Sequence, residues 1–485
     1  MVLRMLGRAE EAGSLLRETL ALDPLDWWAR LLHQEPLHCD LQTRLDIAHD
    51  LARAGFVICA IAALNTRPAP DGDWPRQSLG AAPLVEYTLG WLWEKQGDKK
   101  TAAQHFQRAA SLSPDYCFPS RLEEIAVFES AMRANPRDAR APYYLGNLLY
   151  DRRRHDEAIR LWEKSARLDP GFSVVWRNLG IGCFNIRHDA AKARALYDQA
   201  FRLNPADARL LYERDQLWKR LGETPVKRLR ELKEHPVLVA QRDDLSVEMC
   251  ALLNQTGRPV EALQLLARRN FQPWEGGEGA ALGQHVRTQL ALGREALRCH
   301  DYAGALSHFE NALTPPRNLG EAWHLLAKQS DIHYWLGCAA AAMGEKRKAR
   351  KHWLAAANSQ GDFQERSVRP FSEMTYYSAL AWERLGQKAK AKELLGKLLS
   401  YAKALAKTPA KIDYFATSLP AMLLFDDDLQ FRQRTTASFL QAQAQLGLGN
   451  QAKGQALLKA VLRRDPNHGP AWDLRAEYSK PSFVK

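Results

Sequence analysis

The chain has 485 residues, 46% hydrophobic and 26% charged, a composition that is globular rather than disordered. Its 68 lysines and arginines against 56 aspartates and glutamates give a net charge of +12, which permits an acidic partner, a nucleic acid or an anionic surface without indicating one. The apolar run at 56–64 is far shorter than the ~20 residues of a membrane span, and no signal segment opens the chain, so we expect a cytoplasmic protein without a membrane partner.

The cysteines and short motifs indicate no metal or catalytic centre. The seven cysteines are an odd number, widely separated and without a C-x-x-C pair, which favours small buried residues in a reducing compartment over disulfides or ligands. P-loop, H-E-x-x-H, G-x-S-x-G and zinc-ligand spacings are all missing. We therefore expect no cofactor and no metal, and the sequence favours a protein that is not an enzyme.

Residues 1–64 are predicted to form part of a helical repeat followed by a helix pair. Gly7, Ala12 and Pro24 match the second half of a repeat, so the chain starts inside a helix. A repeat array normally begins with a polar cap, and we therefore expect either a misplaced start codon or the C-terminal portion of a longer protein. Residues 65–83 are rich in proline and glycine and are predicted to be an ordered loop.

A 34-residue repeat marks the block at 84–270. Residues 86–114 place small and large residues at fixed offsets in two successive helices: Leu89, Gly90, Trp93, Gly97, Ala102, Phe106, Ala109 and Pro114. The pattern resembles the tetratricopeptide repeat (TPR), in which small residues let two antiparallel helices approach closely. The aromatic residues of the pattern are then core rather than a cofactor site. One extra helix, at roughly 120–134, is expected within this block because Gly90 and Gly146 are too far apart for one repeat.

The loop at 271–279, FQPWEGGEG, interrupts the helices, because glycine costs about 1 and proline about 3 kcal/mol inside a helix. Its candidate binding residues are Trp274, Glu275, Gly276, Gly277 and Glu278. A binding loop would use the tryptophan as a stacking platform and the glutamates as acceptors for hydroxyls or cations, and a carboxylate pair could also act as general acid and base. The alternative is a structural loop that caps one helix and starts the next.

Residues 280–485 form a second TPR-like block with further irregular segments. The candidates in the first segment are Asn318, Glu321, Asp331 and His333. Because His333 occupies the tryptophan position of its repeat, a partly buried histidine with satisfied hydrogen bonds is favoured over a ligand or base.

A later irregular segment, at 411–432, contains the candidates Asp413 and Tyr414. The acidic triplet at 426–428 is interpreted as a helix N-terminus rather than a metal site.

Basic runs occur at 151–155, 226–233, 345–351 and 388–393. They lack the interleaved aromatic residues of a nucleic-acid surface, so we interpret them as solvated faces and do not expect a nucleic-acid partner. A solenoid that binds RNA or another anion is a weaker alternative, and it would need these runs to line one face.

From about residue 117 onward the chain resembles the C-terminal half of large bacterial TPR proteins that carry a mutarotase-like domain of unknown function before the repeats. Matching stretches include FPSRLEEIAVFESAM, FQPWEGGEG, NLGEAWHL, SDIHYWLG and DYFATSLPAMLLFDDDL. The resemblance implies a solenoid attached to a carbohydrate-type β-sandwich and a loose link to sugar metabolism. This chain departs from the family at Gln272, where we expect histidine, and at Ala322, where we expect glycine.

These observations predict an all-α fold, a TPR-like α-α superhelical solenoid of antiparallel helix pairs with several irregular loops. The expected function is a non-enzymatic scaffold that binds a partner protein or its own N-terminal domain, with the loop at 271–279 as a contact. The alternative is the helical half of a carbohydrate-active enzyme that completes a glycan site on an N-terminal β-sandwich, with Glu275, Glu278 and Glu321 as its acidic residues.

Overall fold

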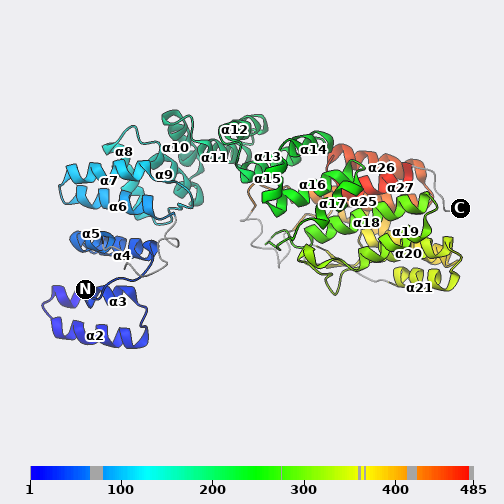
Figure 1. The fold of residues 1–485 in the computed structure, drawn as a ribbon, viewed down its shortest axis with the longest axis horizontal. Helices are drawn as coiled ribbons and strands as arrows, with labels where there is room; N and C mark the ends of the chain where they lie inside the picture. Colours follow the sequence, from blue (N-terminus) through cyan, green and yellow to red (C-terminus); the bar gives the residue numbers. More distant parts are fainter. Residues whose placement is uncertain are drawn as a thin grey trace. The chain divides into compact units, whose positions relative to one another are not determined.

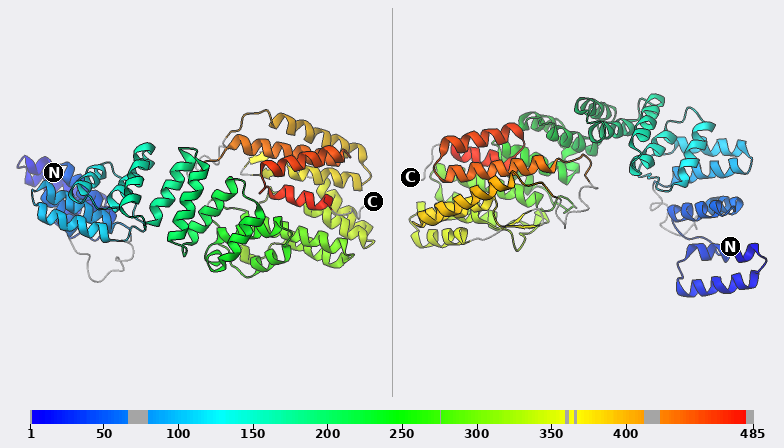
Figure 2. Two further views of the ribbon diagram at one scale, coloured as in Figure 1. Left: turned by 90° about the horizontal axis from the view of Figure 1, so that it is seen from above. Right: turned by 180° about the vertical axis from the view of Figure 1, so that it is seen from behind.

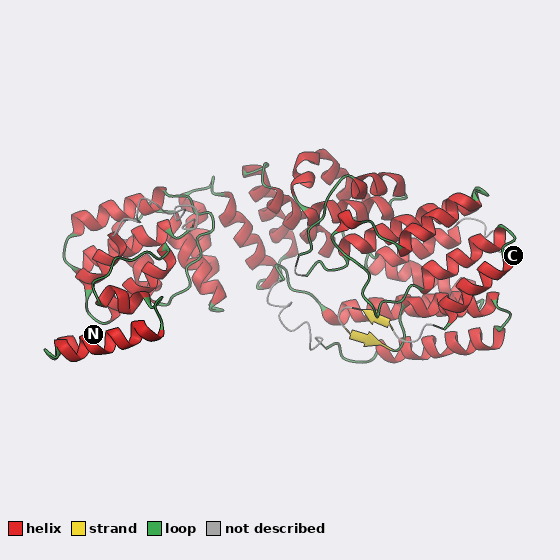
Figure 3. Cartoon of the chain, turned by 60° about the horizontal axis from the view of Figure 1, so that its bottom comes forward, coloured by secondary structure: helices red, strands yellow, loops and turns green. Residues whose placement is uncertain are grey.

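The computed structural model describes residues 2–65, 80–274, 276–358, 362–364, 367–411 and 423–479. The chain divides into two compact units, Met1–Leu203 and Asn204–Lys485 (Figure 1). The predicted all-α architecture of antiparallel helix pairs is confirmed. Within the described residues, one short hairpin of β1 (Asp362–Gln364) and β2 (Ser367–Arg369) is added to the helices (Figure 3).

Unit 1 is built of consecutive helices that pack as antiparallel neighbours around one core. Its helices are α1 (Val2–Met5), α2 (Ala9–Leu22), α3 (Trp27–Leu32), α4 (Leu41–Arg53), α5 (Val57–Asn65), α6 (Ala82–Lys95), α7 (Lys99–Ser111), α8 (Glu123–Ala134), α9 (Arg140–Asp151), α10 (His155–Leu168), α11 (Ser173–Asn185) and α12 (Ala190–Leu203). The extra helix expected near 120–134 is α8. Most of the loop predicted at 65–83 lies outside the described residues.

Unit 2 begins with shorter helices and continues with helix pairs around a second core. Its helices are α13 (Ala208–Arg220), α14 (Pro225–Glu234), α15 (Pro236–Gln241), α16 (Asp243–Gln255), α17 (Pro259–Ala267), α18 (Ala280–Arg298), α19 (Tyr302–Leu313), the short 3-10 helix η2 (Arg317–Leu319), α20 (Ser330–Ala342), α21 (Lys346–Ala357), α22 (Glu373–Arg384), α23 (Lys388–Leu405), α25 (Leu429–Gly447), α26 (Gln451–Arg464) and α27 (Gly469–Ser479). The loop at 271–279, expected from the sequence to separate two blocks, lies within this unit, because α16, α17 and α18 pack against one another on both sides of it.

A glycine of one helix faces an aromatic ring of the next in five helix pairs. A Cβ atom added at the glycine would lie 2.3–2.6 Å from the ring, which leaves no room for any side chain. The five contacts are Gly90 with Phe106, Gly146 with Trp162, Gly180 with Tyr197, Gly293 with Phe309 and Gly337 with Trp353. The predicted close approach of paired helices is thus confirmed; four of these aromatic residues are buried in the core, and Trp353 is partly buried against it.

Candidate functional site

The loop at 271–279 is held against the segment that carries Asn318. The backbone N–H of Phe271 donates to the carbonyl of Asn318 at 2.7 Å, and the Asn318 Nδ2 donates to the carbonyls of Leu266 and Arg269 at 2.8 and 2.7 Å. Gly320 has φ 69°, and a Cβ there would lie 2.5 Å from the carbonyl oxygen of Phe271. Two irregular segments about 50 residues apart in the sequence therefore form one structure at the end of α17.

The side chain of Glu321 caps the N-terminus of α18, the helix that follows the loop at 271–279. Its carboxylate accepts the backbone N–H groups of Gly279 at 2.6 Å and of Leu282 at 3.0 Å. Gly279, the residue before the helix, has no side chain with which to cap it. A carboxylate from another segment takes that role and also interacts favourably with the positive end of the helix dipole.

The remaining loop candidates have more local contacts. The Trp274 ring covers Gly277, where an added Cβ would lie 1.9 Å from the indole, and Gly277 is buried. The Glu278 carboxylate accepts the backbone N–H of Gly276 at 2.9 Å, and its side chain is exposed. Glu275 lies outside the described residues, as do Asp413 and Tyr414.

His333 lies beside a second histidine, His352. Their Nδ1 atoms are 3.2 Å apart and their rings stack with centroids 5.4 Å apart, so one ring donates to the other. Burial lowers the pKa of both side chains, which favours their neutral forms. Nowhere in the described part of the chain do three or more His, Cys, Asp or Glu side chains converge in a way that could hold a metal ion.

The acidic triplet at 426–428 lies at a helix N-terminus, as the sequence indicated. Asp428 caps α25 by accepting the backbone N–H of Phe431 at 2.8 Å, and Asp427 pairs with Arg432 at 2.5 Å. Helix capping and ion pairing therefore explain Asp428 and Asp427.

A groove of about 1540 Å³ opens inside unit 2. It is lined by the loop at 271–279, by the segment 321–331 and by parts of α18, α22, α23, α25 and α27. Its apolar wall includes Leu282, Val286, Leu290, Trp323, Met374, Leu405, Phe439 and Leu474. Four of the predicted site residues line it, namely Gly276, Glu278, Glu321 and Asp331, whereas Trp274, Gly277, Asn318 and His333 are not among its lining residues.

Two arginines of α18 that line this groove contact acidic residues of α27. Arg287 forms a bidentate pair with Asp473 at 2.7 and 3.1 Å, and Arg294 contacts Glu477 at 3.1 Å. The hydroxyl of Tyr377 donates to the same Glu477 carboxylate at 2.9 Å. The sequence analysis did not single out these residues, since their partners are about 100–190 positions away and belong to a stretch that reads as an ordinary repeat.

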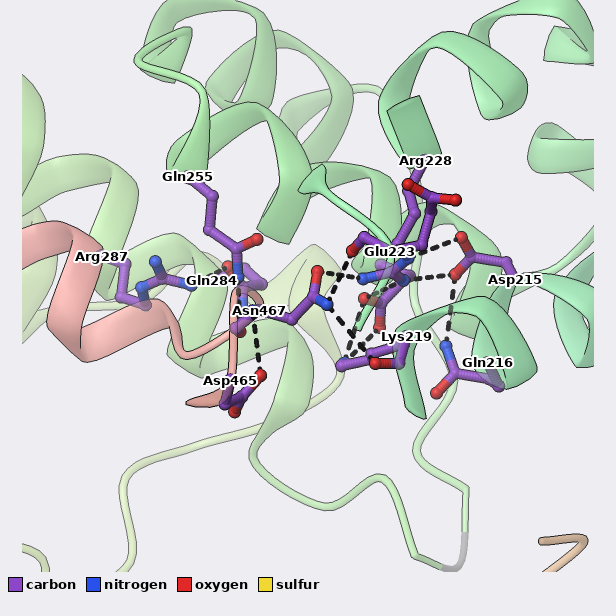
Figure 4. Close-up of polar contacts among 11 residues, drawn as sticks. Asp215, Gln216, Lys219, Glu223, Arg228, Gln255, Gln284, Arg287, Asp465 and Asn467 are labelled. Atoms are coloured by element: carbon purple, nitrogen blue, oxygen red, sulfur yellow. Dashed lines mark hydrogen bonds and ion pairs between the residues drawn. The ribbon is translucent and has the colours of Figure 1, made fainter. Parts of the chain in front are cut away.

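A buried polar cluster holds the beginning of unit 2 to the segment before α27 (Figure 4). Arg228 has no exposed surface and donates to Asp215 at 2.9 and 2.5 Å, to Glu248 at 2.7 Å and to the side-chain oxygen of Asn467 at 2.8 Å. The basic run at 226–233 was predicted to be solvated, and for Arg228 this is wrong. Its guanidinium can be buried because two carboxylates from neighbouring helices compensate its charge.

Asn467 uses both ends of its side chain and its backbone in this cluster. Its Nδ2 donates to the carbonyl of Glu223 at 3.0 Å, and its own carbonyl accepts from Gln255 at 2.9 Å (Figure 4). These bonds join the turn after α13, and α16, to Asn467, more than 200 positions later. The C-terminal end of unit 2 is thereby anchored to its beginning.

Among the described helices, none combines the length and the apolar character that a membrane span requires. Family models described as tetratricopeptide repeat match residues 85–116, 125–171 and 436–468, which cover most or all of the pairs α6–α7, α9–α10 and α25–α26.

A curated relative, Protein FlbA of Caulobacter vibrioides, is 28% identical over 172 residues. The match covers 31% of this chain and 29% of the length of that relative.

Several solved structures resemble part of this chain. They include MamA from Desulfovibrio magneticus RS-1 (17% identity, TM-score 0.24, 42% of this chain and 97% of that one) and a tetratricopeptide repeat protein from Parabacteroides merdae (13%, 0.26, 62% and 98%). A third is YrrB, described as a TPR protein with an unusual peptide-binding site (16%, 0.20, 48% and 92%).

The family matches fall on antiparallel helix pairs, the kind of pair in which a glycine of one helix contacts an aromatic ring of the other. Tetratricopeptide repeats occur in both units, at 85–116 and 125–171 in the first and at 436–468 in the second. These three segments of the chain match the tetratricopeptide repeat.

Proposed function

We propose that the chain is a scaffold that binds a segment of a partner protein in the groove of unit 2. The observation that carries the proposal is the groove itself, which is large enough for a peptide segment and is formed mainly by apolar side chains on the helices. TPR proteins generally mediate protein–protein interactions. The charged side chains in its wall, such as Arg287 and Asp473, would give orientation to a bound segment.

The loop at 271–279 would act as one rim of this groove. Gly276 and Glu278 line it directly, whereas Trp274 would support them by packing on Gly277. The loop would therefore combine the two roles that its sequence suggested, a helix start and a contact surface.

The alternative, a glycan site shared with an N-terminal β-sandwich, would need carboxylates that are available to a sugar. Glu321 instead accepts two backbone N–H groups at the start of α18, and Glu278 accepts one from Gly276. These contacts favour the partner protein over the glycan as our proposal.

An affinity-capture experiment tests the proposal with two exposed leucines. Leu325 lines the groove and is 99% exposed, so Leu325→Asp should leave the fold intact and reduce partner recovery at least tenfold. Leu22 of unit 1 is 89% exposed and lies outside the groove, so Leu22→Asp is the matched control and should leave recovery unchanged. Equal recovery by both variants and the wild type would contradict the assignment of the groove.

A further inference from the structure

Three successive helix pairs of unit 2 have an inner and an outer helix. In α20–α21, α22–α23 and α25–α26, the first helices contact one another in order and contribute residues to the groove wall. The second helices α21 and α26 are not among the elements that line the groove, and α23 lines it with Tyr401 and Leu405 near its C-terminal end. The succession of the pairs can be followed by colour in Figure 2, from yellow-green (α20 and α21) to orange and red (α25 and α26). Helices α21, α23 and α26 are therefore the outer helices of these pairs.

The outer helices carry the excess positive charge of the chain. α21 and α23 have five lysines and arginines each and α26 has four, against a single carboxylate, Glu393. The inner helices α20, α22 and α25 together have three arginines and three carboxylates, so their charges cancel. The net charge of the outer helices is thus +13, whereas that of the whole chain is +12. Two of the basic runs, at 345–351 and 388–393, lie in this outer layer.

We call the lysines and arginines of α21, α23 and α26 the outer basic surface. These side chains are exposed, except that Lys348 is half-buried. Lys348 pairs with Glu310 at 3.5 Å, and Lys397 pairs with Glu393 at 2.6 Å. Because the outer basic surface holds many more cations than carboxylates, most of its charge is not balanced by neighbouring side chains of the described chain.

Helix stability does not account for the position of these cations. Lys346 and Arg347 lie in the first turn of α21, Lys388 and Lys390 lie in the first turn of α23, and neither turn has an acidic residue. The N-terminus of a helix is the positive end of its dipole, so cations placed there are unfavourable for the helix. A bound anion would remove this repulsion, since it interacts favourably with both the side chains and the helix end.

The other side chains of the outer helices indicate which anion fits. All their large apolar residues are buried or half-buried, so the helices present no exposed ring that could stack on unpaired bases and no apolar side chain that could insert into a bilayer. Ten of the fourteen cations are lysines, which bind phosphates as point charges, whereas bidentate recognition of carboxylates favours arginine. A nucleic-acid duplex presents closely spaced phosphates and keeps its bases stacked inside. These features favour a duplex over a single strand, a membrane or an acidic protein.

We propose that the outer basic surface binds the phosphate backbone of a nucleic-acid duplex without reading its sequence. This activity goes beyond the proposed function, because no residue of the outer basic surface lines the groove. The anion-binding alternative considered for the basic runs needed them to line one face. The runs of α21 and α23 meet this requirement, since both helices belong to the same outer layer.

A binding assay with the full chain tests the inference. The probes are fluorescein-labelled DNA and RNA duplexes of two unrelated sequences, followed by anisotropy at about 50 mM salt and at increasing salt. We expect the wild type to bind the duplexes of both sequences alike, with an affinity that falls steeply as salt is added. A variant of α21 should bind at least about tenfold more weakly and show a salt dependence that is less steep by about 2–4 in slope, because each lost phosphate contact removes about 0.9. Its substitutions are Lys346→Gln, Arg347→Gln, Arg350→Gln and Lys351→Gln.

A charge-matched variant of unit 1 is the control. It removes four exposed cations outside the outer basic surface and should bind the duplexes as the wild type does. Its substitutions are Lys99→Gln, Lys100→Gln, Arg133→Gln and Arg137→Gln. An equal loss in the two variants would mean that net charge alone attracts the duplex, and this result would overturn the inference. If circular dichroism shows that the α21 variant is unfolded, the α26 variant Lys459→Gln, Arg463→Gln, Arg464→Gln replaces it, with a weakening in the same direction expected and no weakening overturning the inference.

Two further measurements separate the other anions and the other site. Cosedimentation with vesicles of phosphatidylserine and phosphatidylcholine tests the membrane: binding to vesicles that depends on α21, without binding to a duplex, would overturn the inference. No binding of the wild type to any duplex at about 50 mM salt would also overturn it. Leu325→Asp should leave duplex binding unchanged, and the α21 variant should leave partner capture unchanged. Failure of one site is therefore distinguishable from failure of the other.

Discussion

The first turn of α18 leaves backbone N–H groups without intrahelical partners, and Glu321 accepts two of them. Glu321→Ala should therefore lower the free energy of unfolding of unit 2 by about 1 kcal/mol, the usual effect of losing a cap. Denaturant unfolding followed by circular dichroism measures this difference. Glu393→Ala is the control, because Glu393 forms an exposed ion pair with Lys397 and its replacement should leave the stability of unit 2 almost unchanged. Equal effects of the two substitutions would refute the capping role.

Asn318 shows how the same residue type supports either interpretation from sequence alone. An asparagine beside glycine and proline is as suitable for ligand binding as for holding a helix end. The structure places its amide on the carbonyls of Leu266 and Arg269, about 50 residues earlier. Such a contact depends on how two irregular segments fold together, which no local pattern specifies.

At the scale of helix pairs, the glycine–aromatic contacts set how closely the two helices approach. Gly337→Ala would place a methyl group 2.3 Å from the Trp353 ring, and we expect a loss of about 1–3 kcal/mol of stability from overpacking. Gly283→Ala is the matched control, because nothing lies within 4 Å of its Cβ position in α18. That change should be neutral or should stabilise unit 2 by about 0.5–1 kcal/mol, as alanine favours a helix. Thermal unfolding of both variants checks the opposite signs, and a similar loss in both would contradict the packing argument.

The docking of α27 should weaken as the pH rises through 7. The pKa of Glu477 is about 7 when the helix is docked, and it returns towards its ordinary value of 4.5 when the helix is released. The docked state then binds the proton more strongly, so its stability is greatest at low pH and decreases as the carboxyl ionises. The charged or titratable groups that interact with it include Arg294 on α18, Asp331 and Cys338 on α20, Tyr376 and Tyr377 on α22, and Asp473 and Tyr478 on α27.

Hydrogen exchange of the α27 amides, corrected for intrinsic rates, measures this release. Opening of the wild-type helix should increase between pH 6 and pH 8 relative to the amides of α20. Glu477→Gln removes the titrating group and should flatten the profile. A wild-type profile that is already flat would show that Glu477 does not control the helix.

At the scale of the whole molecule, the buried cluster around Arg228 joins distant parts of unit 2. Arg228→Met leaves Asp215 and Glu248 buried with less compensation, and we expect a loss of about 3–5 kcal/mol from the stability of this unit. Lys227→Met is the control, since Lys227 is its exposed neighbour and pairs at the surface with Glu223. Urea unfolding of both variants tests this prediction. A small effect of Arg228→Met would mean that the cluster does not stabilise the contact between the beginning and the end of unit 2.

The sequence predicted the fold because TPR packing is local. Gly146 and Trp162 lie in adjacent helices, so their spacing alone fixes their contact. The extra helix α8 was predicted from the separation of Gly90 and Gly146, which is too long for one repeat. The gap at 271–279 was also visible, since glycine and proline break helices wherever they occur.

The groove could not be predicted, because its walls come from segments far apart in the chain. Arg287 and Asp473 are separated by 186 residues, and Arg228 and Asn467 by 239. The sequence of a basic run does not show whether a given arginine in it is solvated or buried, as Arg228 illustrates. Only the packing of α14 between acidic neighbours distinguishes them.

Photo-crosslinking from the groove tests most directly whether unit 2 binds a partner segment. A photoreactive amino acid replaces Leu325 in one protein and Leu22 in another, and mass spectrometry identifies the crosslinked peptides. The account predicts that position 325 captures a segment of a partner protein, and that position 22 does not. Capture at both positions alike, or at position 22 alone, would contradict it.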